Sequence, residues 1–249
     1  MLGKLLKYEI PALGRKLIPL YIGWAATAVL LGLAIGPAQS KSEFAVVMTA
    51  LLYSGVATAV VVMAIVMIVQ RYSNSLLGDG GYFSHVLPVT TTEHIASKTI
   101  TAAIWVLLSG VAMVITGFII ALAAGQIRYI QFFGLKELGL YWANVLEFIL
   151  ASILNLTKSI LAIYAALTIG HLAKQHTTLA SIGAYIGLLW FEAVIARIVF
   201  LPMIDLANEV ITEHEFDILV LEVGIVSLVL GGIYFFICKY LLDKKLNLA

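Results

Sequence analysis

The sequence predicts an all-α integral membrane protein with six transmembrane helices. Hydrophobic residues make up 62% of the 249 residues and charged residues only 12%, and the mean hydropathy is +1.04. A soluble domain normally carries about a quarter charged residues, so this chain has too few polar side chains to cover a surface that faces water. Six long apolar runs, separated by polar segments, set the number of spans.

The whole chain, residues 1–249, is expected to form a single transmembrane domain. We expect its spans at residues 17–35, 44–69, 99–124, 148–170, 177–200 and 218–238. A helix that crosses the hydrocarbon core needs about 20 apolar residues, which these runs approach or exceed. Backbone groups in lipid must bond within a helix or a closed barrel, and the runs lack the alternating polar pattern of barrel strands. Helices are therefore predicted throughout.

Both termini are predicted to lie in the cytoplasm. An even number of spans places them on one side, together with the loops 70–98 and 171–176. Most of the lysines and arginines fall on that side, whereas the opposite side carries only Lys41, Arg128 and Lys136. By the positive-inside rule the lysine-rich side is cytoplasmic. We therefore expect a multi-pass membrane protein.

The stretch before the first span, residues 1–16, has the pattern of an interfacial helix. Its apolar stripe consists of Leu2, Leu5, Leu6, Ile10 and Leu13. Lys4 and Lys7 lie on the opposite face, which suits a helix at the membrane surface, and Pro11 is expected to kink or end that helix. A frayed basic anchor and an elbow helix leading into the bundle both fit the pattern.

Residues 70–98 form the widest polar gap on the cytoplasmic side. Glycines at positions 78, 80 and 81 permit turns, and Pro88 ends any helix formed by residues 82–87. Thr90 and Glu93 then have the spacing of a capping box, which predicts the start of a helix that continues into the third span. The result is a short amphipathic helix held between two longer ones.

The apolar side chains of this short helix have the composition of interface anchors. They are Tyr82, Phe83, Val86 and Leu87. Aromatic and large apolar residues are enriched where one protein binds another. Insertion into the lipid headgroup layer, or packing against other loops, is the alternative.

Ionisable and amide side chains inside the spans need partners, because a charge in hydrocarbon costs several kcal/mol. The intramembrane polar candidates are Glu147, Asn155, Lys158, Glu192, Arg197 and Glu222. Glu147 and Lys158 share a helix face but lie about 16 Å apart, too far for a direct pair. We expect an ion pair between Arg197 and Glu222. A polar pathway for a headgroup, an ion or a proton is the functional alternative.

Three segments of the first hundred residues resemble the permease subunits of bacterial ABC-2-type transporters, in particular the short six-span permeases of Gram-positive bacteria. They are MLGKLLKYE at residues 1–9, LLGDGGY at 76–82 and LPVTTTEHIASK at 87–98. The likeness in topology covers the whole chain, and the resemblance implies a multi-pass protein of the bacterial cytoplasmic (plasma) membrane.

The resemblance implies that residues 82–87 are the coupling helix, which docks into a groove of a separate ATP-binding subunit. The implied coupling residues are Tyr82, Phe83, His85, Val86, Leu87, Pro88, Thr90 and Glu93. It also implies an exporter that works with a second permease copy or a paralogous permease. ATP and Mg²⁺ would bind to the partner ATPase, with no cofactor on this chain. Peptides, lipids, drugs and sodium ions lie within the family's range, and the aromatic outer segment 126–142 favours peptides or other amphipathic substrates.

The sequence itself supports an arrangement of two proteins. No phosphate-binding loop of the form GxxxxGK[ST] occurs in it, so this chain is expected to be no enzyme and to need an ATPase partner besides membrane lipid. No nucleic-acid partner is expected. Gly32 with Gly36, and Gly183 with Gly187, have the spacing of close helix contacts, which makes each pair a candidate dimer seam.

Two other classes of protein remain open at this stage. The first is an intramembrane hydrolase that would use Glu192 and Glu222 as acids, although the sequence contains neither HExxH nor GxSxG. His171 and His176 are five residues apart and would diverge by about 140° on a helix, which is poor for shared metal ligation. The second class is a sensor or immunity subunit that transports nothing.

Overall fold

The structure is a computed structural model, and it describes residues 2–36, 42–77, 90–126, 142–173, 175–206 and 213–244. Within these ranges all regular secondary structure is helical. The elements are α1 (Leu2–Ile35), α2 (Glu43–Tyr72), the π-helical turn η1 (Ser73–Leu77), α4 (Thr91–Ala123), α6 (Trp142–Gly170), α7 (Thr177–Leu206) and α8 (Glu213–Lys244). Six helices of the described chain are long and apolar enough to cross a membrane, with α2 and η1 counted as one. The predicted all-helical, six-span architecture is confirmed at this level.

The outward faces of these helices are strongly apolar. In the most apolar windows of α4 and α7 only 6% of the residues are buried inside the protein. Large side chains such as Trp190 and Met113 are 72% and 65% exposed. Soluble monomers rarely expose contiguous apolar surface of this extent. The chain therefore has the construction of a multi-pass membrane protein, in which lipid covers these faces.

Helix α1 is continuous from Leu2 to Ile35 and contains both Pro11 and Pro19. The predicted end of the N-terminal helix at Pro11 does not occur, and the expected elbow segment is the first part of the first long helix. Each proline removes one backbone hydrogen bond. Leu13 and Leu17, which lie between the prolines, are buried in a core and hold the helix in place. An interfacial position for residues 1–16 stays a prediction.

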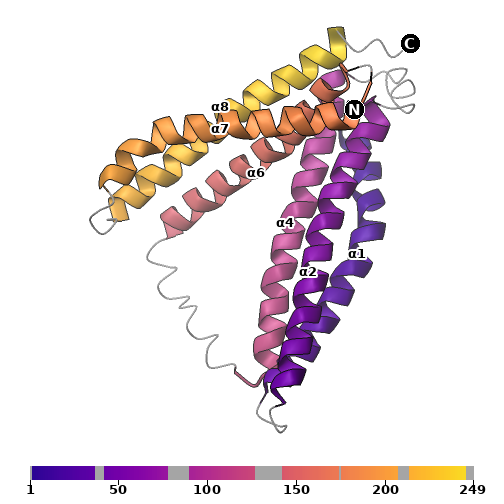
Figure 1. Cartoon of the computed structure of the whole chain (residues 1–249), viewed down its shortest axis with the longest axis vertical. Helices are drawn as coiled ribbons and strands as arrows, with labels where there is room; N and C mark the ends of the chain where they lie inside the picture. The colour runs from indigo at the N-terminus through magenta and orange to yellow at the C-terminus, as the bar shows by residue number, and fades with distance from the viewer. Residues whose placement is uncertain are drawn as a thin grey trace. The chain divides into compact units, whose positions relative to one another are not determined.

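The chain divides into two compact units, and α2 and α4 contribute to both. One unit consists of residues 3–68 and 104–140 and contains most of α1, α2 and α4, which lie side by side (Figure 1). Its core is formed by Leu13, Leu17, Ala64, Met67 and Trp105. The indole Nε1 of Trp105 donates a hydrogen bond to the carbonyl oxygen of Ile10 at 3.1 Å.

Gly32 brings α1 into close contact with α4 in this unit. A Cβ atom added at Gly32 would lie 2.5 Å from Ala123 Cβ and 2.8 Å from the carbonyl oxygen of Ile120. The candidate seam at Gly32 and Gly36 is thus used within the chain. Gly183 and Gly187 on α7 have no neighbouring atom within 4 Å of an added Cβ.

The other unit consists of residues 1–2, 69–103 and 141–249, and α6 packs against both α7 and α8 in it (Figure 1). A short turn joins α6 to α7, and His176 adopts a positive φ of 59° immediately before α7 begins. Gly170 at the end of α6 lies against the backbone of Ser181, where a side chain would clash. This close turn aligns α6 and α7 as an antiparallel pair.

Candidate functional site

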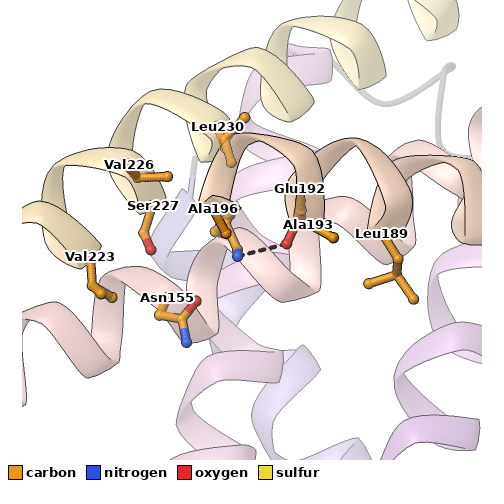
Figure 2. A pocket seen from close by; sticks show the side chains of 10 residues that line it. Asn155, Leu189, Glu192, Ala193, Ala196, Val223, Val226, Ser227 and Leu230 are labelled. Atoms are coloured by element: carbon orange, nitrogen blue, oxygen red, sulfur yellow. Dashed lines mark hydrogen bonds and ion pairs between the residues drawn. The ribbon is translucent and has the colours of Figure 1, made fainter. Parts of the chain in front are cut away.

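A cavity of about 310 Å³ lies among α6, α7 and α8, in the membrane-spanning part of the second unit. Its polar lining residues are Asn155, Lys158, Glu192 and Ser227, and Figure 2 shows side chains from all three helices around it. Its apolar lining residues are Leu189, Ala193, Ala196, Val223, Val226 and Leu230. Three of the predicted intramembrane polar residues, Asn155, Lys158 and Glu192, therefore meet at one place.

Two of the lining residues form an ion pair. Lys158 Nζ donates to Glu192 Oε2 at 2.8 Å, drawn as the dashed line in Figure 2, and the two side chains are only 13% and 16% exposed. The Tyr234 hydroxyl donates to the other carboxylate oxygen, Glu192 Oε1, at 2.9 Å. Each helix thus supplies one member of the cluster. Neutralisation inside the chain is what a buried charge in a membrane requires.

The cluster leaves hydrogen-bonding capacity unused at the cavity wall. An ammonium group has three N–H donors, and Lys158 Nζ uses one of them in its hydrogen bond to Glu192. The Asn155 amide and the Ser227 hydroxyl form no side-chain hydrogen bond with a described residue. Figure 2 shows the Ser227 hydroxyl of α8 directed toward the side of the cavity where Asn155 of α6 lies.

The predicted ion pair between Arg197 and Glu222 is wrong. Arg197 is exposed, whereas Glu222 Oε2 is buried and accepts no hydrogen bond from the described residues. Glu192 is among the residues that line the cavity, and Glu222 is not. Glu147 is half-buried and forms no ion pair with another described residue. Nearby, Asn144 donates to Asp217 at 2.7 Å and links the beginnings of α6 and α8.

The predicted capping box at the start of α4 is present. The amide of Glu93 donates to Thr90 Oγ1 at 3.4 Å, and the amide of Thr90 donates to Glu93 Oε2 at 3.3 Å. Thr91 Oγ1 also donates to Asp243 Oδ1 of α8 at 2.6 Å. The other predicted coupling residues, Tyr82, Phe83, His85, Val86, Leu87 and Pro88, lie outside the described residues, as do residues 127–141 of the aromatic segment 126–142.

A tyrosine junction, defined by Tyr72, Lys98, Tyr164 and Thr168, ties α6 to the two helices that border residues 78–89. The rings of Tyr72 and Tyr164 stack with centroids 4.0 Å apart and planes 8° apart. The Tyr72 hydroxyl bonds to the Thr168 hydroxyl at 3.0 Å, and the Tyr164 hydroxyl donates to the carbonyl oxygen of Lys98 at 3.4 Å. Tyr164 lies six residues, about 9 Å, along α6 from Lys158 of the cavity.

Sequence reasoning missed Ser227 and Tyr234 on α8 and the members of the tyrosine junction. A usable signal existed for α8, because Ser227 and Tyr234 are seven residues apart and therefore occupy one helix face. A hydroxyl-bearing aromatic residue in the middle of an apolar span needs a hydrogen-bond partner, which Glu192 supplies here.

Searches for a matching family model, a similar curated protein and a similar solved structure find no match to this chain. Among the described residues, no group of three or more His, Cys, Asp or Glu side chains is placed to hold a metal ion.

Proposed function

We propose that this chain is the permease subunit of an ABC-2-type transporter of the bacterial plasma membrane. It forms part of a translocation path for peptides or other amphipathic substrates and works as an exporter. A second copy or a related permease completes the membrane part, and a separate subunit binds ATP and Mg²⁺. The sequence pattern of residues 76–98, the six apolar helices and the missing phosphate-binding loop support this proposal.

The observation that carries the proposal is the tyrosine junction. In a coupled transporter, movement of the segment that docks to the ATPase, here residues 78–89, must change the position of the polar groups that face the substrate. Residues 78–89 connect the helices α2 and α4, and α6 contacts both of them through Tyr164. The same helix α6 carries Lys158 into the cavity. A pull on residues 78–89 by an ATPase would thus act on the wall of the cavity through one rigid element.

Co-purification tests this proposal. The tagged chain is isolated from its native membrane in mild detergent, copurifying proteins are identified, and ATPase activity of the eluate is measured. We expect a soluble protein with a phosphate-binding loop, lost in the double variant Phe83→Ala, Leu87→Asp. Phe44→Ala, an exposed aromatic at the start of α2, is the matched control and should retain the partner. Recovery of this chain alone from wild-type membranes, with no ATPase activity, would contradict the proposal.

The two rival classes have less support. A hydrolase with two acids needs both carboxylates at one site, whereas Glu222 does not line the cavity that holds Glu192. A sensor or immunity subunit would function without ATP and would tolerate substitution of Phe83. Dependence of its activity on a copurifying ATPase separates that class from a permease.

A further inference from the structure

We propose that the cavity among α6, α7 and α8 binds an uncharged apolar amide, such as a segment of an apolar peptide, through Asn155, Ser227 and the free donors of Lys158. This names the substrate class of the proposed permease and so rests on that function. The first reason is charge. The pair of Lys158 with Glu192 is already neutral, and a charged ligand would add an uncompensated charge within the membrane.

The second reason is the balance of donors and acceptors. Lys158 retains donors, whereas both oxygens of Glu192 already accept a hydrogen bond. The side chains of Asn155 and Ser227 add both donors and acceptors, and neither side chain forms a hydrogen bond with a described residue. A peptide amide offers a carbonyl acceptor and an N–H donor together. A lipid ester offers acceptors alone, so an amide can form hydrogen bonds with more of the polar groups that line the cavity.

The third reason is the composition and size of the cavity. Its remaining walls are aliphatic, with Leu189, Val223 and Leu230 among the lining residues. The volume of about 310 Å³ lies at the lower end of the range of ligand pockets. Polar groups without hydrogen-bond partners in an apolar environment cost free energy. A ligand that carries both a hydrogen-bonding amide and apolar side chains therefore fits better than an acyl chain.

Photolabelling of the full chain in lipid nanodiscs tests this inference. The probe is a dipeptide of two photoreactive leucines with an acetylated N-terminus and an amidated C-terminus. We expect it to label lining segments of α6, α7 and α8, and labelling should fall about three- to tenfold in Asn155→Leu and in Ser227→Ala. Ser159→Ala is the matched control. This exposed hydroxyl of α6 bonds only to its own helix backbone, so its removal should leave labelling unchanged.

Two comparison probes decide the chemistry. The same dipeptide with free, charged termini should label the cavity several-fold less. An analogue with the central amide replaced by an ester lacks the N–H donor and should also label less. Equal labelling would mean that the cavity recognises only carbonyl groups, which lipid esters also supply. Equal labelling by either analogue overturns the inference, as does labelling that persists in the Asn155→Leu, Ser227→Ala double variant. Absence of cavity labelling by the blocked dipeptide also overturns it.

The outcome is independent of the docking test. If the ATPase partner copurifies and the blocked dipeptide does not label the cavity, the permease proposal stands and the substrate inference fails. If the cavity is labelled as expected and no ATPase copurifies, the chain binds amides without being a subunit of this kind of transporter.

Discussion

Glu192 is the residue on which the polar cluster of the membrane region depends. It accepts one hydrogen bond from Lys158 on α6 and one from Tyr234 on α8. Loss of its carboxylate would leave a largely buried ammonium group without a counter-charge, which is far more costly than the net gain from forming a buried pair. Lys158 and Glu192 are both mostly buried, so solvent screening reduces this cost little.

We predict that Glu192→Leu lowers the free energy of unfolding by about 3 kcal/mol. Adding Lys158→Met should recover most of the loss, because an apolar pair of similar volume replaces the ion pair. Unfolding of the detergent-solubilised protein, followed by circular dichroism during titration with a denaturing detergent, measures both changes.

Glu222→Leu provides the matched control for this prediction. Glu222 also belongs to one of the six long apolar helices, but its Oε2 atom is buried without a hydrogen bond from the described residues. Its replacement by leucine should change the free energy of unfolding by no more than about 0.5 kcal/mol, or should stabilise the fold. Equal losses from Glu192→Leu and Glu222→Leu would show that the ion pair has no special role.

The sequence could have predicted Glu192 as the partner of Lys158, but it could not have predicted that Arg197 does not pair with Glu222. Lys158 lies 12 positions before the end of α6 and Glu192 lies 15 positions after the start of α7, so their depths differ by roughly 5 Å. Arg197 and Glu222 also match in depth, each nine positions from the facing helix ends. Whether two residues at the same depth form a pair then depends on how each helix is rotated about its axis, and the packing of the helices fixes that rotation.

At the scale of elements, Gly32 sets how closely α1 approaches α4. An alanine there would meet Ala123 Cβ and the backbone of Ile120 closer than real Cβ contacts allow, and backbone cannot rotate away. Gly23, in the same helix, has nothing within 4 Å of an added Cβ. A glycine-to-alanine substitution at each position therefore separates the cost of close packing, present only at Gly32, from the gain in helix propensity, present at both.

We predict that Gly32→Ala destabilises the protein by about 1–3 kcal/mol through overpacking. Gly23→Ala should instead be neutral or stabilise by about 0.5–1 kcal/mol, because alanine favours the helix interior. Thermal unfolding midpoints of the purified variants measure both effects. A shift of the same sign and size at the two positions would mean that α1 and α4 do not pack at Gly32.

The existence and order of the long helices follow from the apolar runs, but their ends do not. Helix α8 begins at Glu213 and ends at Lys244, beyond the predicted span 218–238, because polar residues continue a helix once the apolar part has formed it. Pro11 was expected to kink or end the N-terminal helix, but α1 continues past it, because the buried contacts of the residues around it outweigh one lost hydrogen bond. The capping box at Thr90 was predicted correctly because it is a local interaction.

At the scale of the whole molecule, the proposed coupling needs a rigid link from residues 78–89 to the cavity. The stacked rings of Tyr72 and Tyr164 provide one between α2 and α6, and the bond from Thr91 to Asp243 provides another between α4 and α8. Both links belong to the unit that contains the cavity. Movement of the docking segment would therefore displace the cavity walls directly.

We predict that Tyr164→Leu uncouples the proposed transporter. Loss of the ring stack should lower transport by about two- to thirtyfold, while ATP hydrolysis and association with the ATPase persist, since Tyr164 is not one of the proposed docking residues. Tyr240→Leu, an exposed tyrosine of α8, is the control and should leave transport unchanged. Uptake of a labelled substrate into inverted vesicles, measured with ATPase activity in the same sample, gives both quantities. Parallel loss of the two activities would indicate a damaged fold, and unchanged transport in a stably folded Tyr164→Leu protein would remove the tyrosine junction from the coupling path.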